Sequence, residues 1–111
     1  MGQYYAYVNT ERKEFFYPHA TGTGAKALEQ FNTEAPNLLI YLLIKSDGSG
    51  GGDIYNGGKL LGSWAGQPVV LIGDYDSSKL YEKAGVEFTD IGPELVAEYN
   101  KATNSDVKPW E

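Results

Sequence analysis

The pattern of apolar and polar positions is clearest at residues 67–76, Gln-Pro-Val-Val-Leu-Ile-Gly-Asp-Tyr-Asp. Four consecutive apolar residues lie between a proline and a Gly-Asp turn signal. A short apolar run bounded by turn residues is typical of a buried strand. We therefore expect a central strand from Val69, around which the rest of the chain is arranged.

The N-terminal residues predict a β-hairpin. Residues 3–8 alternate loosely and contain three Tyr and one Val, which favours a strand. A polar, turn-prone stretch follows at residues 9–13, and residues 14–17 then resume with three aromatic residues. Because proline cannot continue the pairing, the second strand ends at Pro18, and His19 is expected on a connecting loop.

Two segments of the first half predict helices. A short helix is expected from Thr23 or Gly24 to Asn32, with Ala25, Leu28 and Phe31 on one apolar face. Residues 38–44 are apolar all round, so their periodicity does not separate a buried helix from a buried strand. Four Leu and a preceding proline favour the helix, whereas two Ile and a Tyr also suit a strand.

The second half predicts alternating short elements. Leu60 and Leu61 indicate a short strand that forms a ladder with the central strand. Asp76 or Ser77 is expected to cap a helix that bears Leu80, Tyr81 and Ala84 on its apolar face and ends near Gly85. Residues 86–91 alternate as a half-buried strand does, and Gly92-Pro93-Glu94 is typical of the start of a last helix.

Together these elements predict a single α+β domain over residues 1–103. Its sheet is expected to be mostly antiparallel, with about five strands and three to four helices packed mainly on one face. Residues 104–111 are polar apart from Val107 and Trp110, so they are expected to form a loose C-terminal tail.

Composition excludes several classes of protein. The absence of cysteine among 111 residues excludes disulfides, thiolate nucleophiles and cysteine-ligated metal centres. A net charge of -6 with nine Lys plus Arg gives no basic patch for nucleic acid. The longest apolar run has seven residues, well short of the roughly 20 that cross a membrane. With no signal-peptide pattern at the start, we expect a cytoplasmic protein that binds neither nucleic acid nor membrane.

Residues 46–58 form a glycine-rich loop with six Gly in thirteen positions. The spacing is not that of a phosphate-binding P-loop, because Asp53 stands at the first glycine position and Leu60 follows Lys59. A surface connection is the favoured interpretation, and anion binding is the alternative. Residues 22–27 match Gly-x-Gly-x-x-Ala, but the preceding strand ends too early for a dinucleotide fingerprint, so a helix entry is favoured.

Acidic residues flank the loop and the expected central strand. If Asp47, Asp53, Asp74 and Asp76 meet at one rim, they could bind Ca²⁺ or Mg²⁺. The stretch from Asp74 does not complete a calcium-binding loop, since it has Lys79 and Gly85 where glycine and glutamate are required. The alternative roles are helix capping by Asp76 and turn formation by Asp74, and no cofactor is then expected.

Two further side chains are candidates for chemistry. His19 can serve as a general base beside a pocket, although a loop histidine bonded to backbone is the favoured interpretation. Ser63 lacks the Gly-x-Ser-x-Gly context of a hydrolase nucleophile. Trp64 is either a core anchor, which is favoured, or an exposed platform for a ligand.

An ordered set of motifs resembles a group of small bacterial and phage-type proteins with no assigned activity. The motifs are Met1-Gly2-Gln3-Tyr4-Tyr5, Asn9 with Lys13-Glu14, Pro18-His19, Gly22-x-Gly24-x-Lys26, Gly50-Gly51-Gly52-Asp53, Gly62-Ser63-Trp64-Ala65-Gly66 and Gly73-Asp74-Tyr75. The resemblance implies a shared fold and a bacterial-type intracellular setting, but no reaction. Where that group has an acid after Trp-Ala-Gly, this chain has Gln67.

These features predict a small ligand- or protein-binding module rather than an enzyme. Its binding rim is expected to contain His19, Asp53, Trp64, Asp74 and Tyr75. One alternative is a metal-assisted hydrolase or transferase that uses His19 with Asp53 and Asp74. Another is an assembly subunit that associates through its Tyr-rich hairpin. The rim and the metal site both require Asp53 to lie beside the end of the central strand.

Overall fold

The predicted hairpin forms the middle of the sheet. In the computed structural model, which describes residues 3–45 and 52–109, β1 (Tyr5–Asn9) pairs antiparallel with β2 (Glu14–Phe16), and Tyr7 lies opposite Phe16. The turn between them is closed by Asn9, whose Oδ1 accepts hydrogen bonds from the backbone N–H groups of Glu11 and Arg12, both at 2.9 Å. The sequence therefore located both strands and the turn correctly.

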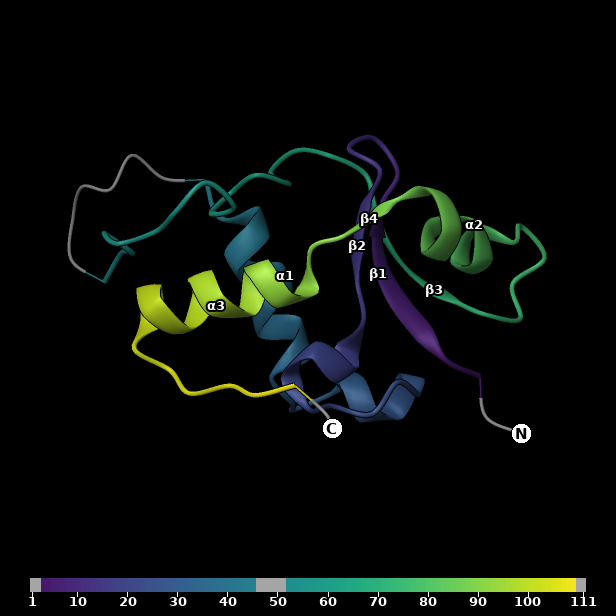
Figure 1. The fold of residues 1–111 in the computed structure, drawn as a ribbon, viewed down its shortest axis with the longest axis horizontal. Helices are drawn as coiled ribbons and strands as arrows, with labels where there is room; N and C mark the ends of the chain where they lie inside the picture. Colours follow the sequence, from purple (N-terminus) through teal and green to yellow (C-terminus); the bar gives the residue numbers. More distant parts are fainter. Residues whose placement is uncertain (1–2, 46–51, 110–111) are drawn as a thin grey trace.

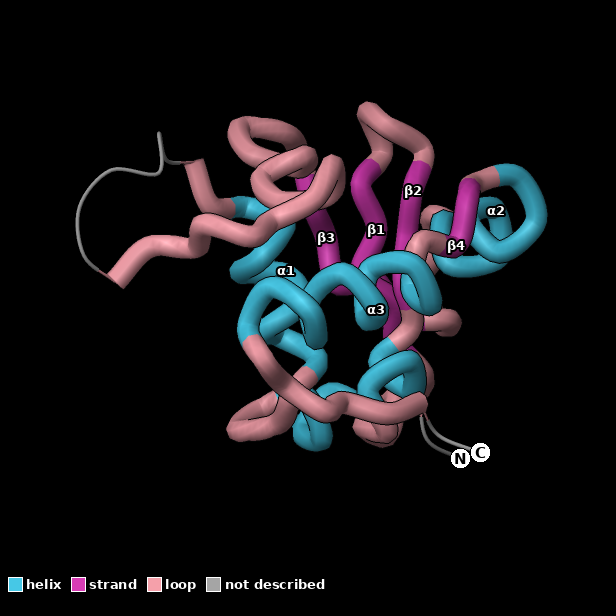
Figure 2. Tube along the Cα trace, turned by 60° about the vertical axis from the view of Figure 1, so that its left-hand side comes forward, coloured by secondary structure: helices cyan, strands magenta, loops and turns pink. Residues whose placement is uncertain are grey.

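The predicted central strand lies at an edge. β3 (Val69–Gly73) pairs antiparallel with β1, and β4 (Thr89–Asp90) pairs parallel with β2, which gives the order β3-β1-β2-β4 (Figure 2). The sheet is thus mixed and four-stranded, and the expectation of about five mostly antiparallel strands is wrong in detail. Val70 and Leu71 are 39% and 37% exposed because β3 has a strand on one side only.

Helices cover both faces of this sheet (Figure 1). α1 (Ala35–Leu43) and α3 (Gly92–Thr103) lie on one face and α2 (Leu80–Glu87) lies on the other. Side chains alternate along β1, so Tyr7 faces α1 and α3 whereas Ala6 and Val8 face α2. Two hydrophobic cores result, one on each side of an α+β domain.

The larger core confirms the helical interpretation of residues 38–44. α1 has Pro36 in its first turn, and it buries Leu38, Tyr41 and Leu42 at helical spacing. α3 begins at the predicted Gly92-Pro93-Glu94. The remaining buried members of this core include Tyr7, Phe16, Leu60, Trp64, Ile91, Leu95 and Val96.

The apolar face predicted for residues 24–32 is wrong. This segment contains only a 3-10 helix, η2 (Ala27–Gln30), and Leu28 and Phe31 are 84% and 70% exposed. The buried residue is instead Gln30, whose Nε2 donates to the backbone oxygens of Gly24 and Lys26. Its Oε1 accepts a 2.9 Å hydrogen bond from the Tyr7 hydroxyl. A polar side chain therefore attaches the segment to the sheet.

Three predictions for the second half also need correction. Leu60 and Leu61 lie in turns and form no strand, because β3 takes β1 as its partner instead. α2 continues past Gly85 to Glu87, so the strand expected over residues 86–91 is reduced to Thr89–Asp90. Asp76 accepts a hydrogen bond from the Ser78 N–H and closes the turn before α2, whereas the residue at the helix N-cap is Lys79.

Two short segments complete the fold. His19 lies within a 3-10 helix, η1 (Pro18–Thr21), rather than in an irregular loop. In the C-terminal segment, for which the sequence predicts a loose tail, Val107 exchanges two hydrogen bonds with the Asn100 side chain of α3. Within residues 3–45 and 52–109, no helix has the length and apolar character needed to cross a membrane.

Candidate functional site

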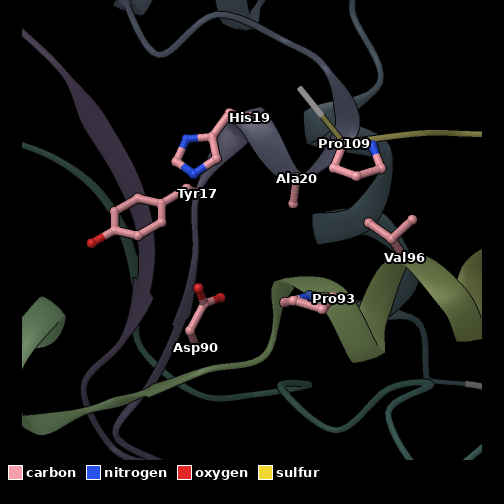
Figure 3. A pocket seen from close by; sticks show the side chains of 7 residues that line it. All are labelled: Tyr17, His19, Ala20, Asp90, Pro93, Val96 and Pro109. Carbon is pink, nitrogen blue, oxygen red and sulfur yellow. The ribbon is translucent and has the colours of Figure 1, made fainter. Parts of the chain in front are cut away.

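A pocket of about 270 Å³ lies where η1, the start of α3 and the C-terminal segment meet. Figure 3 shows three polar or aromatic side chains along one side of it and four apolar side chains along the other. The first group is Tyr17, His19 and Asp90, and the second is Ala20, Pro93, Val96 and Pro109. The pocket therefore combines a polar wall with an apolar wall.

The two rings of the polar wall are stacked. The centroids of Tyr17 and His19 are 4.9 Å apart, and their planes differ by 18°. Pro18 between them is fully buried, and the Ala20 N–H donates to the Tyr17 carbonyl oxygen at 3.0 Å. The buried proline and the 3-10 turn thus hold both rings in one orientation at the mouth of the pocket.

Asp90 contributes a carboxylate to the same wall. It ends β4, and its Oδ1 accepts a 2.8 Å hydrogen bond from the Gly92 N–H at the start of α3. Its Oδ2 has no hydrogen-bond partner in the part of the chain that the structure describes. Burial raises the pKa of the Tyr17 hydroxyl, and the negative charge of Asp90 raises it further. The carboxylate therefore acts on Tyr17 and retains an oxygen for a ligand.

The apolar wall depends on the C-terminal segment. Val96, which is buried, comes from α3, and the Asn100–Val107 hydrogen bonds place the segment that brings Pro109 to the same wall. The segment also lies close to Gly22, which has a φ of +81° and whose added Cβ would be 3.1 Å from the Lys108 oxygen. Glycine is required there for both its left-handed backbone and the close approach.

His19 also borders a second hollow of about 500 Å³. Its other lining residues are Tyr4, Ala25, Lys26, Glu29 and Tyr81. Burial raises the pKa of the Tyr81 hydroxyl, and nearby Tyr17, Asp74 and Tyr4 add to the effect. The imidazole thus separates a mainly apolar pocket from one that contains charges of both signs.

The structure does not bring the five predicted rim residues together. The segment that contains Asp53 and the turn after β3 that contains Asp74 lie at opposite ends of the longest axis, along which the molecule extends 45 Å (Figure 1). Trp64 is fully buried, and its Nε1 donates to Glu14 Oε1 at 2.8 Å, which makes it a core residue. Tyr75 is exposed beyond β3. The spatial arrangement on which the predicted rim depended is therefore wrong.

The predicted metal ligands accept hydrogen bonds from backbone N–H groups. Asp53 Oδ1 accepts from the Ile54 N–H, and Asp74 Oδ1 accepts from the Tyr4 N–H. Hydrogen bonds from Ser78 lower the pKa of the Asp76 carboxyl. Asp47 lies outside the described residues. Among residues 3–45 and 52–109, no three His, Cys, Asp or Glu side chains are placed to hold a metal ion.

Sequence reasoning missed Tyr17 and Asp90. Both had a usable signal: Tyr17 precedes the Pro18-His19 pair, and Asp90 lies two residues before the helix-starting Gly92. An aspartate at that spacing commonly accepts a hydrogen bond from an N–H group at the start of the helix, which fixes its carboxylate there.

No protein-family model, curated protein or solved structure matches the chain.

Proposed function

We propose that this protein is a small-molecule-binding module whose ligand is a small organic cation. The ligand is held in the Tyr17–Asp90 pocket, with its apolar body against Pro93, Val96 and Pro109. The observation that carries the proposal is a carboxylate with an available oxygen, placed opposite an apolar wall. Pockets that combine apolar lining with a few polar groups are the usual form of a ligand site.

Two properties favour a cation over an anion. Asp90 presents negative charge at the pocket, and a cation in contact with its carboxylate forms a charge-assisted hydrogen bond. The net charge of -6 also raises the local concentration of cations around the molecule. An anion would instead be repelled by the Asp90 carboxylate and by the net negative charge of the molecule.

The size of the pocket limits the ligand. A volume of about 270 Å³ is close to the lower end of the roughly 300–1,000 Å³ found for small-molecule sites. A single ring with a short amine fits this description, whereas a nucleotide or a dinucleotide does not. The metal-assisted reaction predicted for His19 with Asp53 and Asp74 has no support in this geometry, because the segment that contains Asp53 lies at the opposite end of the molecule from the turn that contains Asp74.

Titration with benzylamine, benzyl alcohol and benzoate tests the proposal, because the three probes share a ring and differ in charge. Backbone amide signals of Ala20, Gly92 and Val96 should shift with benzylamine in NMR spectra. Benzyl alcohol should bind about 10-fold more weakly, a difference of about 1.4 kcal/mol. Benzoate should cause no saturable shift. Equal binding of benzoate and benzylamine would contradict the proposal.

The variant Asp90→Asn removes the charge and keeps an oxygen that can accept from the Gly92 N–H. We expect it to weaken benzylamine binding about 10-fold and to leave benzyl alcohol binding unchanged. Asp106→Asn is the matched control, because it removes the same charge from the C-terminal segment outside the pocket lining. A similar loss in both variants would show that general electrostatics, rather than the pocket, attracts the amine.

A further inference from the structure

β3 has a free edge. It is the last strand of the order β3-β1-β2-β4, and Figure 2 shows no strand beyond it. Val70 and Leu71, at its middle, are both more than one-third exposed. The exposed strand is therefore available to pair with another extended segment.

The turn after β3 shows which residues of the strand direct their backbone N–H and C=O groups toward β1. Asp74 donates its N–H to the Tyr4 oxygen at 2.8 Å, so it faces β1. Because backbone groups alternate in an antiparallel pair, Ile72 and Val70 also face β1. The N–H and C=O groups of Val69 and Leu71 and the N–H of Gly73 therefore point away from β1, whereas the Gly73 oxygen accepts a 3.2 Å hydrogen bond from the Asp76 N–H.

This edge lacks the features that normally prevent strands from pairing. Residues 67–73 contain no charged side chain, and the β1–β3 register is continuous without a bulge. Pro68 lies before the strand rather than within it. The five residues of β3 thus form an uninterrupted apolar template.

An apolar groove of about 400 Å³ lies beside Leu71 on the α1 face of the sheet. Phe31, which is mostly exposed, forms part of its wall. The other lining residues are Tyr7, Ala27, Gln30, Asn32 and Pro36. A strand added to β3 would place its own side chains over this groove.

We infer that β3 pairs antiparallel with β3 of a second copy of this chain, about a twofold axis at Leu71. In this register Val69 lies opposite Gly73 of the second copy, and Leu71 lies opposite its counterpart. The outward groups then form about four hydrogen bonds between the chains, two in the Leu71 pair and one from each Gly73 N–H to the Val69 oxygen of the other copy. Both Leu71 side chains lie on the groove side, where they fill the space beside Phe31.

Charge allows a second copy to pair in this register, although the chain is acidic. Asp74 lies opposite the uncharged Pro68 of the second copy, and Asp76 lies opposite its Gly66. The two Asp74 residues are about 20 Å apart along the paired strands, more than twice the screening length at physiological salt. No like charges therefore face each other across the paired edge.

Sedimentation measurements of wild type, Leu71→Lys and Val86→Lys test the inference. The paired edge is smaller than a standard interface, so we expect a dimer with a Kd of roughly 10–100 µM. Leu71→Lys should remain monomeric because it places two positive charges side by side at the axis. Val86→Lys changes an exposed apolar residue of α2, away from the edge, and should dimerise as wild type does. A wild-type monomer at about 1 mM, or equal effects of both variants, would overturn the inference.

Amide hydrogen exchange of the unaltered chain provides a second measurement. The Leu71 N–H points outward, so it should exchange rapidly in the monomer and become protected as concentration rises. The Val70 N–H, which faces β1, should be protected at every concentration. A Leu71 amide whose protection does not depend on concentration would overturn the inference even if Leu71→Lys failed to fold.

Discussion

Glu98 joins three separate parts of the molecule through one side chain. Its Oε2 accepts hydrogen bonds from the Tyr41 hydroxyl at 2.6 Å, the Leu60 N–H at 3.0 Å and the Leu61 N–H at 3.1 Å. The Gly58 N–H donates to the same oxygen at 3.2 Å. An ionised carboxylate is well suited to accept from several donors, because hydrogen bonds to a charged acceptor are stronger than hydrogen bonds between neutral groups. Glu98 on α3 therefore holds the turn at residues 58–61 and also binds α1.

Glu98→Gln should lower the free energy of unfolding by about 2 kcal/mol, because it removes the charge that these donors share. Urea unfolding measures the loss, and amide exchange at Leu60 should accelerate at the same time. Glu94→Gln is the control: Glu94 lies one turn earlier on α3 and forms an exposed ion pair with Lys59 at 3.1 Å. Surface pairs of this kind contribute below about 1 kcal/mol. Equal losses in the two variants would contradict the anchoring role of Glu98.

At the scale of elements, Asn9 determines the shape of the hairpin. Its side chain is fully buried, and its Nδ2 donates to Gln67 Oε1 at 2.8 Å while its Oδ1 accepts the two turn N–H groups. The hairpin turn is thereby connected to the segment that enters β3. The left-handed residue at Lys13, with a φ of 56°, completes the turn.

Asn9→Ala should destabilise the protein by about 2 kcal/mol, because it removes the acceptor of two turn N–H groups and the hydrogen bond from the buried Asn9 amide to Gln67. Thermal and urea unfolding measure this change. Thr10→Ala, at the neighbouring exposed turn position, should cost less than about 0.5 kcal/mol. Should Thr10→Ala prove as costly as Asn9→Ala, general turn propensity rather than the Asn9 bonds would govern the hairpin.

The elements predicted correctly are those with strong local signals. The hairpin strands, α1 and α3 each have a turn residue or a proline at a position that fits the element. The place of β3 was not predictable in this way, because an apolar strand becomes central only when strands pair on both of its sides. Leu28 and Phe31 likewise have helical spacing but are exposed, since Gln30 attaches their segment by hydrogen bonds.

At the scale of the whole molecule, the candidate site combines residues that no sequence window connects. His19 belongs to η1, Asp90 ends β4, and Pro109 lies in the C-terminal segment. The sequence identified His19 as a candidate but grouped it with Asp53 and Asp74, because all lie near glycine-rich or strand-ending positions. Only the parallel pairing of β2 with β4 brings Asp90 near Tyr17, and a two-residue strand gives no periodicity to predict it.

The larger core also connects stability to pH. Burial raises the pKa of the Tyr7 hydroxyl from 10.0 to about 12. The pKa of the Tyr41 hydroxyl is also raised to about 12, mainly by burial and secondly by its hydrogen bond to Glu98. The folded protein thus keeps these protons more tightly than the unfolded chain does. Their contribution to stability is complete below about pH 10 and is lost as the pH rises through about 12.

Tyr7→Phe should therefore reduce the loss of stability between about pH 9 and pH 12, because the variant lacks one buried group that must ionise. At neutral pH it should be less stable than wild type, since the Gln30 side chain loses the hydrogen bond from the Tyr7 hydroxyl. Urea unfolding across this pH range measures both effects. Tyr75→Phe, at an exposed position, should follow the wild-type pH dependence. If Tyr7→Phe also follows it, then alkaline unfolding is caused by growing net negative charge rather than by ionisation in the core.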